Sequence, residues 1–423
     1  MNAAHHSIPG PDDITRVTLS NGITILARPN FNSPAVSISG YLQAGGINDP
    51  DEKLGLAYFT ASALMRGTEK RSFQELYDAL ESIGASMGFS GATHTTTFKG
   101  KALAEDIDRL LDILSDTLRS PVFPSRQIDI LRAQHLTGLA IRAQSTDEMA
   151  ALAFDKIVYR GHPYSRPEDG YTETIRQITR QDLVDFHRKI YGPAGMVIAI
   201  VGAIDPVQAT EKVSAMLGDW ENPAQPAPPE LPPVQPLDRL TEEKVVIPGK
   251  IQSDIVLGTA GPPRRSPDFL PVSLGNSVLG QFGMMGRIGE AVREKAGLAY
   301  YAYSSLGGGI GPGPWTVSAG VNPANVEKAV DLIRQEIRRF VDAPVTPEEL
   351  NDTRESAIGM MPLALESNIG VASALINLER YQLGLDYYRR FESMLRSIDT
   401  QQVWEASRRY LHPDKLAVAV AGP

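Results

Sequence analysis

An internal repeat constrains the fold of this chain more than any other feature of its sequence. Residues 175–202 and 395–422 align without a gap and read IRQITRQDLVDFHRKIYGPAGMVIAIVG and LRSIDTQQVWEASRRYLHPDKLAVAVAG. The identical pairs are Arg176/Arg396, Ile178/Ile398, Gln181/Gln401, Arg188/Arg408, Pro193/Pro413, Ala199/Ala419 and Gly202/Gly422. Each copy predicts a helix that begins near Thr179 or Asp399, a turn with proline, and a strand. The repeat indicates two similar domains, which are either a duplicated stable module or two domains that enclose a cleft.

The segment between the two copies divides the chain. Residues 220–239 read WENPAQPAPPELPPVQPLDR. This density of proline excludes a helix or a central strand and predicts a stiff linker. A chain of 423 residues is also too long for a single hydrophobic core. We therefore predict an N-terminal domain of residues 1–220, a linker of 221–239 and a C-terminal domain of 240–423.

Both halves mix strand and helix patterns. Apolar residues alternate with polar ones in the strand-like segments 17–27, 36–43 and 244–257. In segments 104–118 and 323–341 apolar residues recur every three or four positions, which indicates amphipathic helices. Hairpin-like strand pairs mixed with helices predict an α+β fold, with an antiparallel-rich sheet packed by helices in each domain.

The composition excludes several classes of function. The formal net charge of −9 argues against a nucleic-acid surface, which needs a basic patch. The chain contains no cysteine, which rules out disulfides and thiolate metal sites and fits a reducing compartment. It has neither a secretory signal pattern at its start nor an apolar run of the ~20 residues that span a bilayer. We expect a cytoplasmic protein without a membrane or nucleic-acid partner.

Five short motifs lie along nearly the whole chain. They are Gly45-Gly46, GLA at 55–57 followed by RGT at 66–68, His162-Pro163-Tyr164, Tyr191-x-Pro193 before a strand that ends at Gly202, and REKAGLAY at 293–300. Together they resemble the M16 (insulinase- and pitrilysin-like) metallopeptidase family, in the M16B branch that includes mitochondrial processing peptidase. The resemblance implies two homologous domains that together form half of a clamshell.

The residues that would bind zinc in this family are replaced. Active members carry H-x-x-E-H on the helix that begins at GLA, where two His bind Zn²⁺ and the Glu activates water. The resemblance puts Tyr58, Ala61 and Ser62 at these positions, and Gly138 near the place of the third ligand. No two of the seven histidines are three to five residues apart; they are His5, His6, His94, His135, His162, His187 and His412. We predict that this chain holds no metal and no other cofactor.

The second half keeps a different part of the family's site. The resemblance implies that Arg293 and Tyr300 project toward the zinc, bind the peptide and stabilise the negative charge on the scissile carbonyl. A permanent cation and a phenol donor suit that role. From the residues alone, Arg293 could instead form an ion pair with Glu290 or Glu294 while Tyr300 packs.

These features lead to a functional prediction with alternatives. The resemblance implies a non-zinc-binding subunit of a heterodimeric peptidase. This subunit would bind peptide and supply Arg293 and Tyr300 to the active site of a partner. The partner would carry an intact H-x-x-E-H and bind the zinc. Alone, such a subunit would be inactive as a zinc protease. The alternatives are an inert structural subunit and a peptide-binding homodimer. An independent hydrolase has no support, since the sequence justifies no Ser/His/Asp arrangement.

Overall fold

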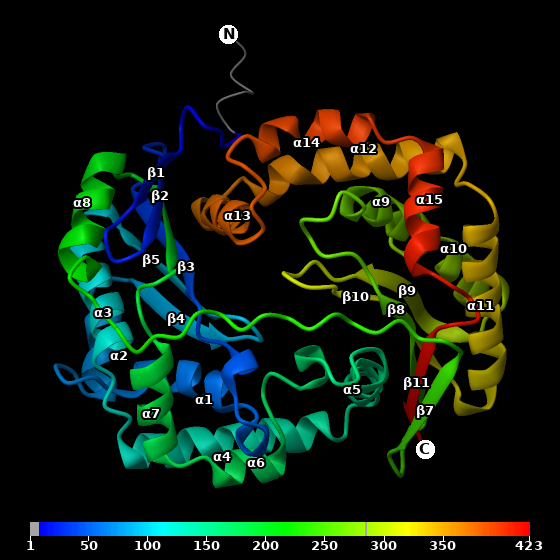
Figure 1. The fold of residues 1–423 in the computed structure, drawn as a ribbon, viewed down its shortest axis with the longest axis horizontal. Helices are drawn as coiled ribbons and strands as arrows, with labels where there is room; N and C mark the ends of the chain where they lie inside the picture. The colour runs from blue at the N-terminus through cyan, green and yellow to red at the C-terminus, as the bar shows by residue number, and fades with distance from the viewer. Residues whose placement is uncertain (1–7, 284–285) are drawn as a thin grey trace. The chain divides into compact units, whose positions relative to one another are not determined.

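The chain folds into two compact units, and each unit is built from several segments (Figure 1). The structure is a computed structural model that describes residues 8–283 and 286–423. Of the described residues, the first unit contains 8–139, 167–230 and 361–389. The second unit contains residues 140–166, 231–360 and 390–423. Both halves of the chain therefore contribute to both units.

The first unit is organised around a six-stranded mixed sheet, called here the first sheet. Its strands, in spatial order, are β1 (Thr15–Thr18), β2 (Thr24–Pro29), β6 (Val197–Gly202), β3 (Ala35–Leu42), β5 (Thr96–Leu103) and β4 (Ser86–Gly91). The β2–β6 pair is parallel and the other pairs are antiparallel.

The second unit has a five-stranded mixed sheet, called here the second sheet. Its strands, in spatial order, are β7 (Thr241–Val246), β11 (Ala417–Gly422), β8 (Ser253–Ala260), β10 (Pro314–Val321) and β9 (Ala299–Leu306). The β7–β11 pair is parallel and the other pairs are antiparallel.

The two sheets have the same topology, which confirms the α+β fold with an internal duplication. The order β2-β6-β3-β5-β4 of the first sheet matches β7-β11-β8-β10-β9 of the second, and the first sheet has the additional strand β1. The repeated segments occupy equivalent places, because β6 and β11 each lie between a parallel and an antiparallel neighbour. Helices α7 (Arg180–Ile190) and α15 (Thr400–Tyr410) precede these strands and start 220 residues apart (400 − 180).

The predicted helix starts are confirmed as well. Thr179 accepts a hydrogen bond from the Asp182 backbone N–H, and Asp399 accepts one from the Gln402 backbone N–H. In both cases the side chain three residues on bonds back to the capping residue, so both helices begin with a capping box.

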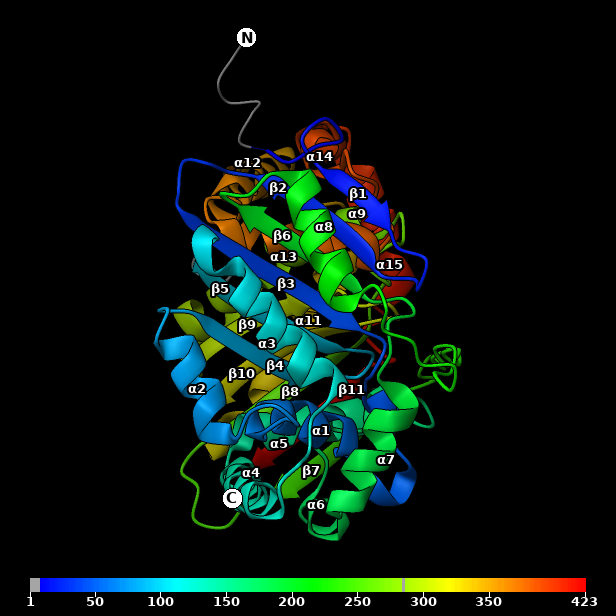
Figure 2. The same cartoon turned by 90° about the vertical axis from the view of Figure 1, so that its left-hand side faces the viewer.

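Helices cover both faces of each sheet. Those not yet named are α1 (Leu56–Ala63), α2 (Phe73–Glu81), α3 (Ile107–Arg119), α4 (Ser125–Arg142), α5 (Thr146–Val158), α6 (Thr172–Gln177), α8 (Pro206–Leu217), α9 (Phe269–Gly280), α10 (Gly286–Ile288), the π-helix η7 (Gly289–Lys295), α11 (Val326–Asp342), α12 (Pro347–Ala364), α13 (Asn368–Arg380) and α14 (Tyr387–Arg396). Helices α3 and α8 pack on one face of the first sheet (Figure 2), and α13 packs on the other. In the second unit α9 and α11 cover one face and α5 the other.

Two of these helices are exchanged between the halves of the chain. Helix α5 comes from the first half but packs on β8 and β11 of the second sheet, whereas α13 comes from the second half and packs on β3 and β6 of the first sheet. Both helices are 13 residues long, start 222 residues apart (368 − 146) and are capped by a serine, Ser145 or Ser367. The exchange is therefore a property of the repeated unit.

The linker region has no helix or strand between α8 and β7. Its last residues belong to the second unit, where Val234 and Leu237 pack against the small core cluster that also contains Phe154 and Tyr159.

In the described residues no single helix is long and apolar enough to cross a membrane, and one bent pair, α12 with α13, meets the length and composition criteria only when taken together.

Candidate functional site

Helix α1 is held in place by a buried carboxylate. Gly55, just before the helix, has a φ of +93°, a conformation that favours glycine. Asp49, which is 6% exposed, accepts hydrogen bonds from the backbone N–H groups of Gly55 (2.8 Å) and Ala57 (2.9 Å). A carboxylate at a helix N-terminus satisfies unpaired donors and complements the helix dipole. Asp49 thus fixes the start of α1 through its bonds to two residues of the GLA motif.

Replacing Asp49 by alanine should destabilise the first unit. The change leaves two buried N–H groups without their acceptor, so we expect the free energy of unfolding to fall by about 1–2 kcal/mol. Urea unfolding followed by circular dichroism measures the change, and Glu52→Ala, at an exposed position nearby, is the matched control. An equal stability of both variants would show that Asp49 does not hold α1.

The three positions predicted to replace the zinc motif lie on α1. Ala61 is 1% exposed, and Tyr58 and Ser62 are half-buried. The Tyr58 ring makes an edge contact with the ring of His135 on α4, at a centroid distance of 5.1 Å. The His135 Nε2 lies 2.7 Å from the carbonyl oxygen of Asp169. An aromatic contact between α1 and α4 therefore lies beside these positions.

The positions that correspond to the zinc motif carry no histidine and no carboxylate on either helix. Gly138, the position nearest the expected third ligand, is exposed on α4 and has no side chain. Across residues 8–283 and 286–423, no three histidine or carboxylate side chains are grouped so that they could hold a metal ion. His5 and His6 lie outside the described residues.

Arg293 and Tyr300 lie at two irregular places in the second unit. Arg293 is on the seven-residue π-helix η7, a conformation often found at functional sites. Tyr300 is at a bulge of β9, because Ala299 pairs with Val321 and Tyr301 pairs with Gly320, which leaves Tyr300 without a pairing partner. Bulges bend a strand and redirect its side chains.

The two side chains differ in how far they are engaged. Arg293 forms an exposed ion pair with Glu294 (3.7 Å), one of the two contacts that the residues alone suggested. Tyr300 does not pack, since it is 71% exposed, and its hydroxyl makes no hydrogen bond to any described residue. An exposed phenol on a bulge is available to a ligand. The catalytic role of Arg293 and Tyr300 stays a prediction.

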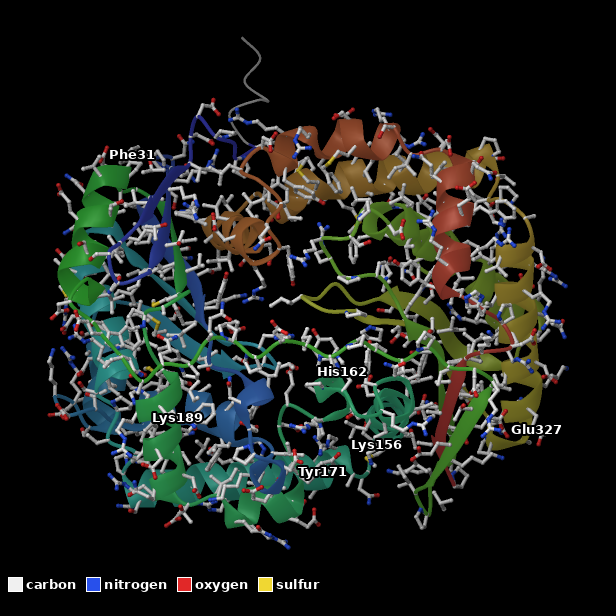
Figure 3. All side chains as sticks on the ribbon, in the orientation of Figure 1. Phe31, Lys156, His162, Tyr171, Lys189 and Glu327 are labelled. Carbon is white, nitrogen blue, oxygen red and sulfur yellow. The ribbon has the colours of Figure 1, made fainter. Side chains whose placement is uncertain are left out.

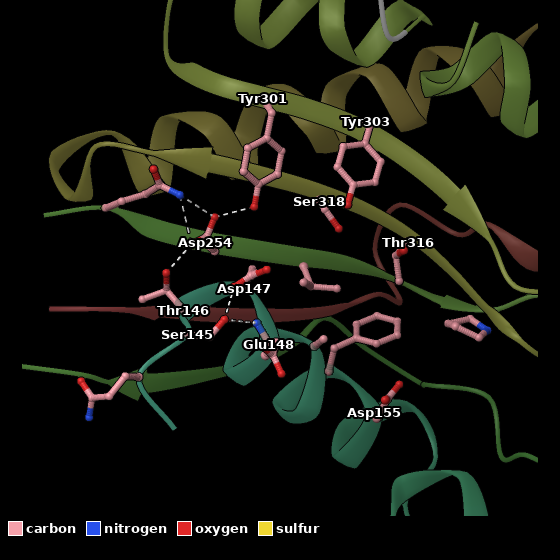
Figure 4. A pocket seen from close by; sticks show the side chains of 16 residues that line it. Ser145, Thr146, Asp147, Glu148, Asp155, Asp254, Tyr301, Tyr303, Thr316 and Ser318 are labelled. Atoms are coloured by element: carbon pink, nitrogen blue, oxygen red, sulfur yellow. Dashed lines mark hydrogen bonds between the residues drawn. The ribbon is translucent and has the colours of Figure 1, made fainter. Parts of the chain in front are cut away.

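A pocket of about 730 Å³ lies in the second unit, between α5 and the second sheet (Figure 4). Asp254 on β8 is 2% exposed and accepts hydrogen bonds from Tyr301 Oη (2.5 Å), Gln252 Nε2 (2.9 Å) and Thr146 Oγ1. The bond from Thr146, the first residue of α5, links the N-terminus of that helix to the sheet. Burial, followed by the hydrogen bond to Asp254, raises the pKa of Tyr301, so this phenol stays a donor at neutral pH.

A second carboxyl group in this pocket has an unusual pKa. Asp155, on the next turns of α5, faces the cavity (Figure 4), and burial raises its pKa from 3.8 to about 7. The pocket therefore contains two different carboxyl groups, one with a pKa near neutral and one that is fully hydrogen-bonded. The sequence gives no signal for Asp155 or Asp254, because the pocket forms only where α5 packs on β8.

Comparisons with known proteins agree with this fold. The protein-family model described as "Insulinase (Peptidase family M16)" matches residues 24–168, and the family model described as "Peptidase M16 inactive domain" matches residues 177–357. An uncharacterised zinc protease of Mycobacterium leprae is 25% identical over 416 residues, which cover 97% of this chain and 92% of that protein. The mitochondrial-processing peptidase subunit beta of Saccharomyces cerevisiae is 26% identical over 391 residues, 88% and 82% of the two chains.

A solved structure has the same architecture. The crystal structure of a peptidase M16 inactive domain from Pseudomonas fluorescens aligns with a TM-score of 0.89 and 25% identity, over 97% of this chain and 98% of the other. The two family matches are consecutive and together span well over half of the sequence. The chain therefore belongs to peptidase family M16, as its motifs indicated, and folds as two homologous M16 domains.

Proposed function

We propose that this chain is the non-zinc-binding subunit of a heterodimeric M16B peptidase. In this proposal it binds peptide and contributes Arg293 and Tyr300 to the active site of a partner that carries an intact H-x-x-E-H and its zinc. The observation that carries the proposal is the Tyr300 hydroxyl, which is exposed on a strand bulge and has no hydrogen-bond partner among the described residues.

The chemistry of α1 supports a role without metal in this chain. Ala61 cannot act as a base, and Ser62 is not a usual zinc ligand. Tyr58 offers a phenol, which is not a usual zinc ligand either. A peptidase that uses this chain would therefore need its zinc from elsewhere. The relative in yeast is itself named as a subunit of a processing peptidase, which supports a family in which chains act together.

Two alternatives remain within the same fold. An inert structural subunit would leave Tyr300 without a task, and a peptide-binding homodimer would use the same residues without cleavage. We favour the heterodimer because an arginine and a phenol donor suit an oxyanion better than a purely structural contact. The cytoplasm is the location we propose, since a chain without cysteine fits a reducing compartment.

The purified chain is expected to contain no stoichiometric zinc and to show no chelator-sensitive peptidase activity. The physical reason is that Tyr58, Ala61, Ser62 and Gly138 supply no histidine or carboxylate to the metal. Elemental analysis after expression in zinc-supplemented medium measures the metal, with an M16 chain that carries H-x-x-E-H as the positive control. One zinc per chain, bound by this chain's own side chains, would overturn the proposal.

Reconstitution tests the proposed partnership. The chain is mixed with each M16 chain of its own genome that carries an intact H-x-x-E-H, and cleavage of a fluorogenic peptide library is followed. We expect one such mixture to cleave peptides faster than either chain alone, and chelation to abolish the activity. If every zinc-bearing chain is equally active without this subunit, the structural alternative replaces the proposal.

A further inference from the structure

A row of cations that form no ion pair with the described residues lies on the first sheet, on the face that α13 only partly covers. Lys99 and Lys101 on β5 pair with Ser39 and Ser37 of β3, and Tyr41 pairs with Thr97. Directly paired residues of an antiparallel ladder share a face, so both lysines lie on the same face as Tyr41. We call Lys99, Lys101 and Arg380, with the Tyr41 ring, the cationic row.

Arg380 completes the cationic row from α13. Its guanidinium lies over the Tyr41 ring at 4.6 Å from the centroid. Its Nε atom is buried and has no hydrogen-bond partner. Arg380 makes no ion pair with any described residue, whereas the neighbouring Glu379 is bonded to Arg16 (2.6 and 3.2 Å). A partly buried guanidinium without a counter-ion is a candidate anion site.

The two lysines are also without counter-ions. Both are exposed, and in the described residues neither forms an ion pair. The β4 residues opposite them and Thr97 are Ser86, Gly88 and Ser90, which carry no charge. Gly88, opposite Lys99, has open space where a side chain would be. Like charges held close together without an anion repel each other, so a bound carboxylate would relieve this repulsion.

The spacing of the cationic row matches an extended peptide. Residues two apart on a strand are separated by roughly 6.8 Å, and successive side chains of an extended peptide on one side have the same spacing. The cationic row has this spacing. It runs from Lys101 to Lys99 and then to the Tyr41–Arg380 pair, since Tyr41 lies opposite Thr97, two residues from Lys99.

We propose that the cationic row binds an acidic peptide segment with carboxylates at alternate positions. The inference rests on the proposed function, for which it names the class of peptide. The corresponding face of the second unit has the opposite character, since its pocket contains Asp147, Glu148, Asp155 and Asp254. The duplicated sheets thus have faces of opposite charge, and an acidic peptide would bind the first sheet rather than the second.

Fluorescence anisotropy with the isolated chain tests the proposal without a zinc-bearing partner. The probe is a fluorescein-labelled (Glu-Ala)₄ peptide, compared with (Gln-Ala)₄ and (Lys-Ala)₄. We expect only the Glu peptide to bind, with an affinity that falls as salt is added. Lys99→Glu and Lys101→Glu should each weaken binding about tenfold, whereas Lys99→Arg keeps it.

Lys189→Glu is the matched control, because it makes the same charge change at an exposed position on α7 (Figure 3). It should leave binding unchanged, and thermal melting checks that every variant is folded. Equal binding of the Glu and Gln peptides, or equal effects of Lys99→Glu and Lys189→Glu, would overturn the proposal. Tighter Lys99-dependent binding of a single-stranded oligonucleotide would overturn it in favour of a nucleic-acid site. If no reconstituted mixture cleaves peptide although the isolated chain still binds the Glu probe, the heterodimer proposal is contradicted and the peptide site is not.

Discussion

Replacing Tyr300 by phenylalanine is expected to lower the kcat of the reconstituted pair about 10²–10³-fold, the usual effect of removing one donor to a developing oxyanion. The Tyr300 side chain is 71% exposed and its hydroxyl makes no hydrogen bond to the described part of the chain. The variant therefore loses no internal contact of that hydroxyl, and its stability and assembly with the partner should not change. The measurement is steady-state turnover of the fluorogenic peptide at saturating subunit concentrations.

The controls separate chemistry from binding. Tyr77→Phe removes a hydroxyl from another exposed tyrosine, on α2, and should leave kcat unchanged. Arg293→Ala should raise KM in addition to lowering kcat, since a guanidinium that anchors the peptide contributes to the ground state as well. If Tyr300→Phe turns over at the wild-type rate in an intact complex, the chain is a scaffold and the inert structural subunit is the better assignment.

Replacing Asp155 by asparagine is expected to stabilise the protein at alkaline pH. Burial raises the pKa of this carboxyl group from 3.8 to about 7 in the folded state. Below pH 3.8 the group is protonated in both states and contributes no difference. As the pH rises from 4 through 7, the unfolded chain ionises first, so wild-type stability falls relative to the variant. With 1.36 kcal/mol for each pKa unit, the difference reaches about 4 kcal/mol above pH 8 as an upper bound.

Urea unfolding at pH 4.5, 6.5 and 8.5 measures this difference. The advantage of Asp155→Asn should grow across the three pH values, while Asp129→Asn, at an exposed position on α4, should show no such trend. A constant difference between variant and wild type would mean that the side chain is ionised throughout, and the pocket would then be better solvated than its geometry indicates.

Local elements of the fold were predictable from the sequence because their signals are local. The capping side chains Thr179 and Asp399 lie next to the helices that they start, and the runs of valine, isoleucine and alanine that follow form β6 and β11. The helices predicted at 104–118 and 323–341 form at 107–119 and 326–342, each after a short 3-10 turn. The family motifs were also readable, since each is a short run of residues.

The candidate sites were only partly predictable. The positions of Arg293 and Tyr300 follow from a motif, but the π-helix and the strand bulge that carry them depend on how η7 and β9 pack. The pocket of the second unit joins Thr146 to Asp254 across 108 residues of sequence. The cationic row joins Arg380 to Tyr41, and no spacing in the sequence connects these two residues.

The exchange of α5 and α13 shows where the sequence stops and the tertiary structure decides. The sequence by itself determined that the chain repeats one structural unit, and it places a serine directly before each of the two helices. An apolar helix face specifies that it must be buried, but not against which sheet, because hydrophobic burial is non-directional. Only the folded chain decided that α5 packs on the second sheet and α13 on the first, and with that choice it created both the acidic pocket and the cationic row.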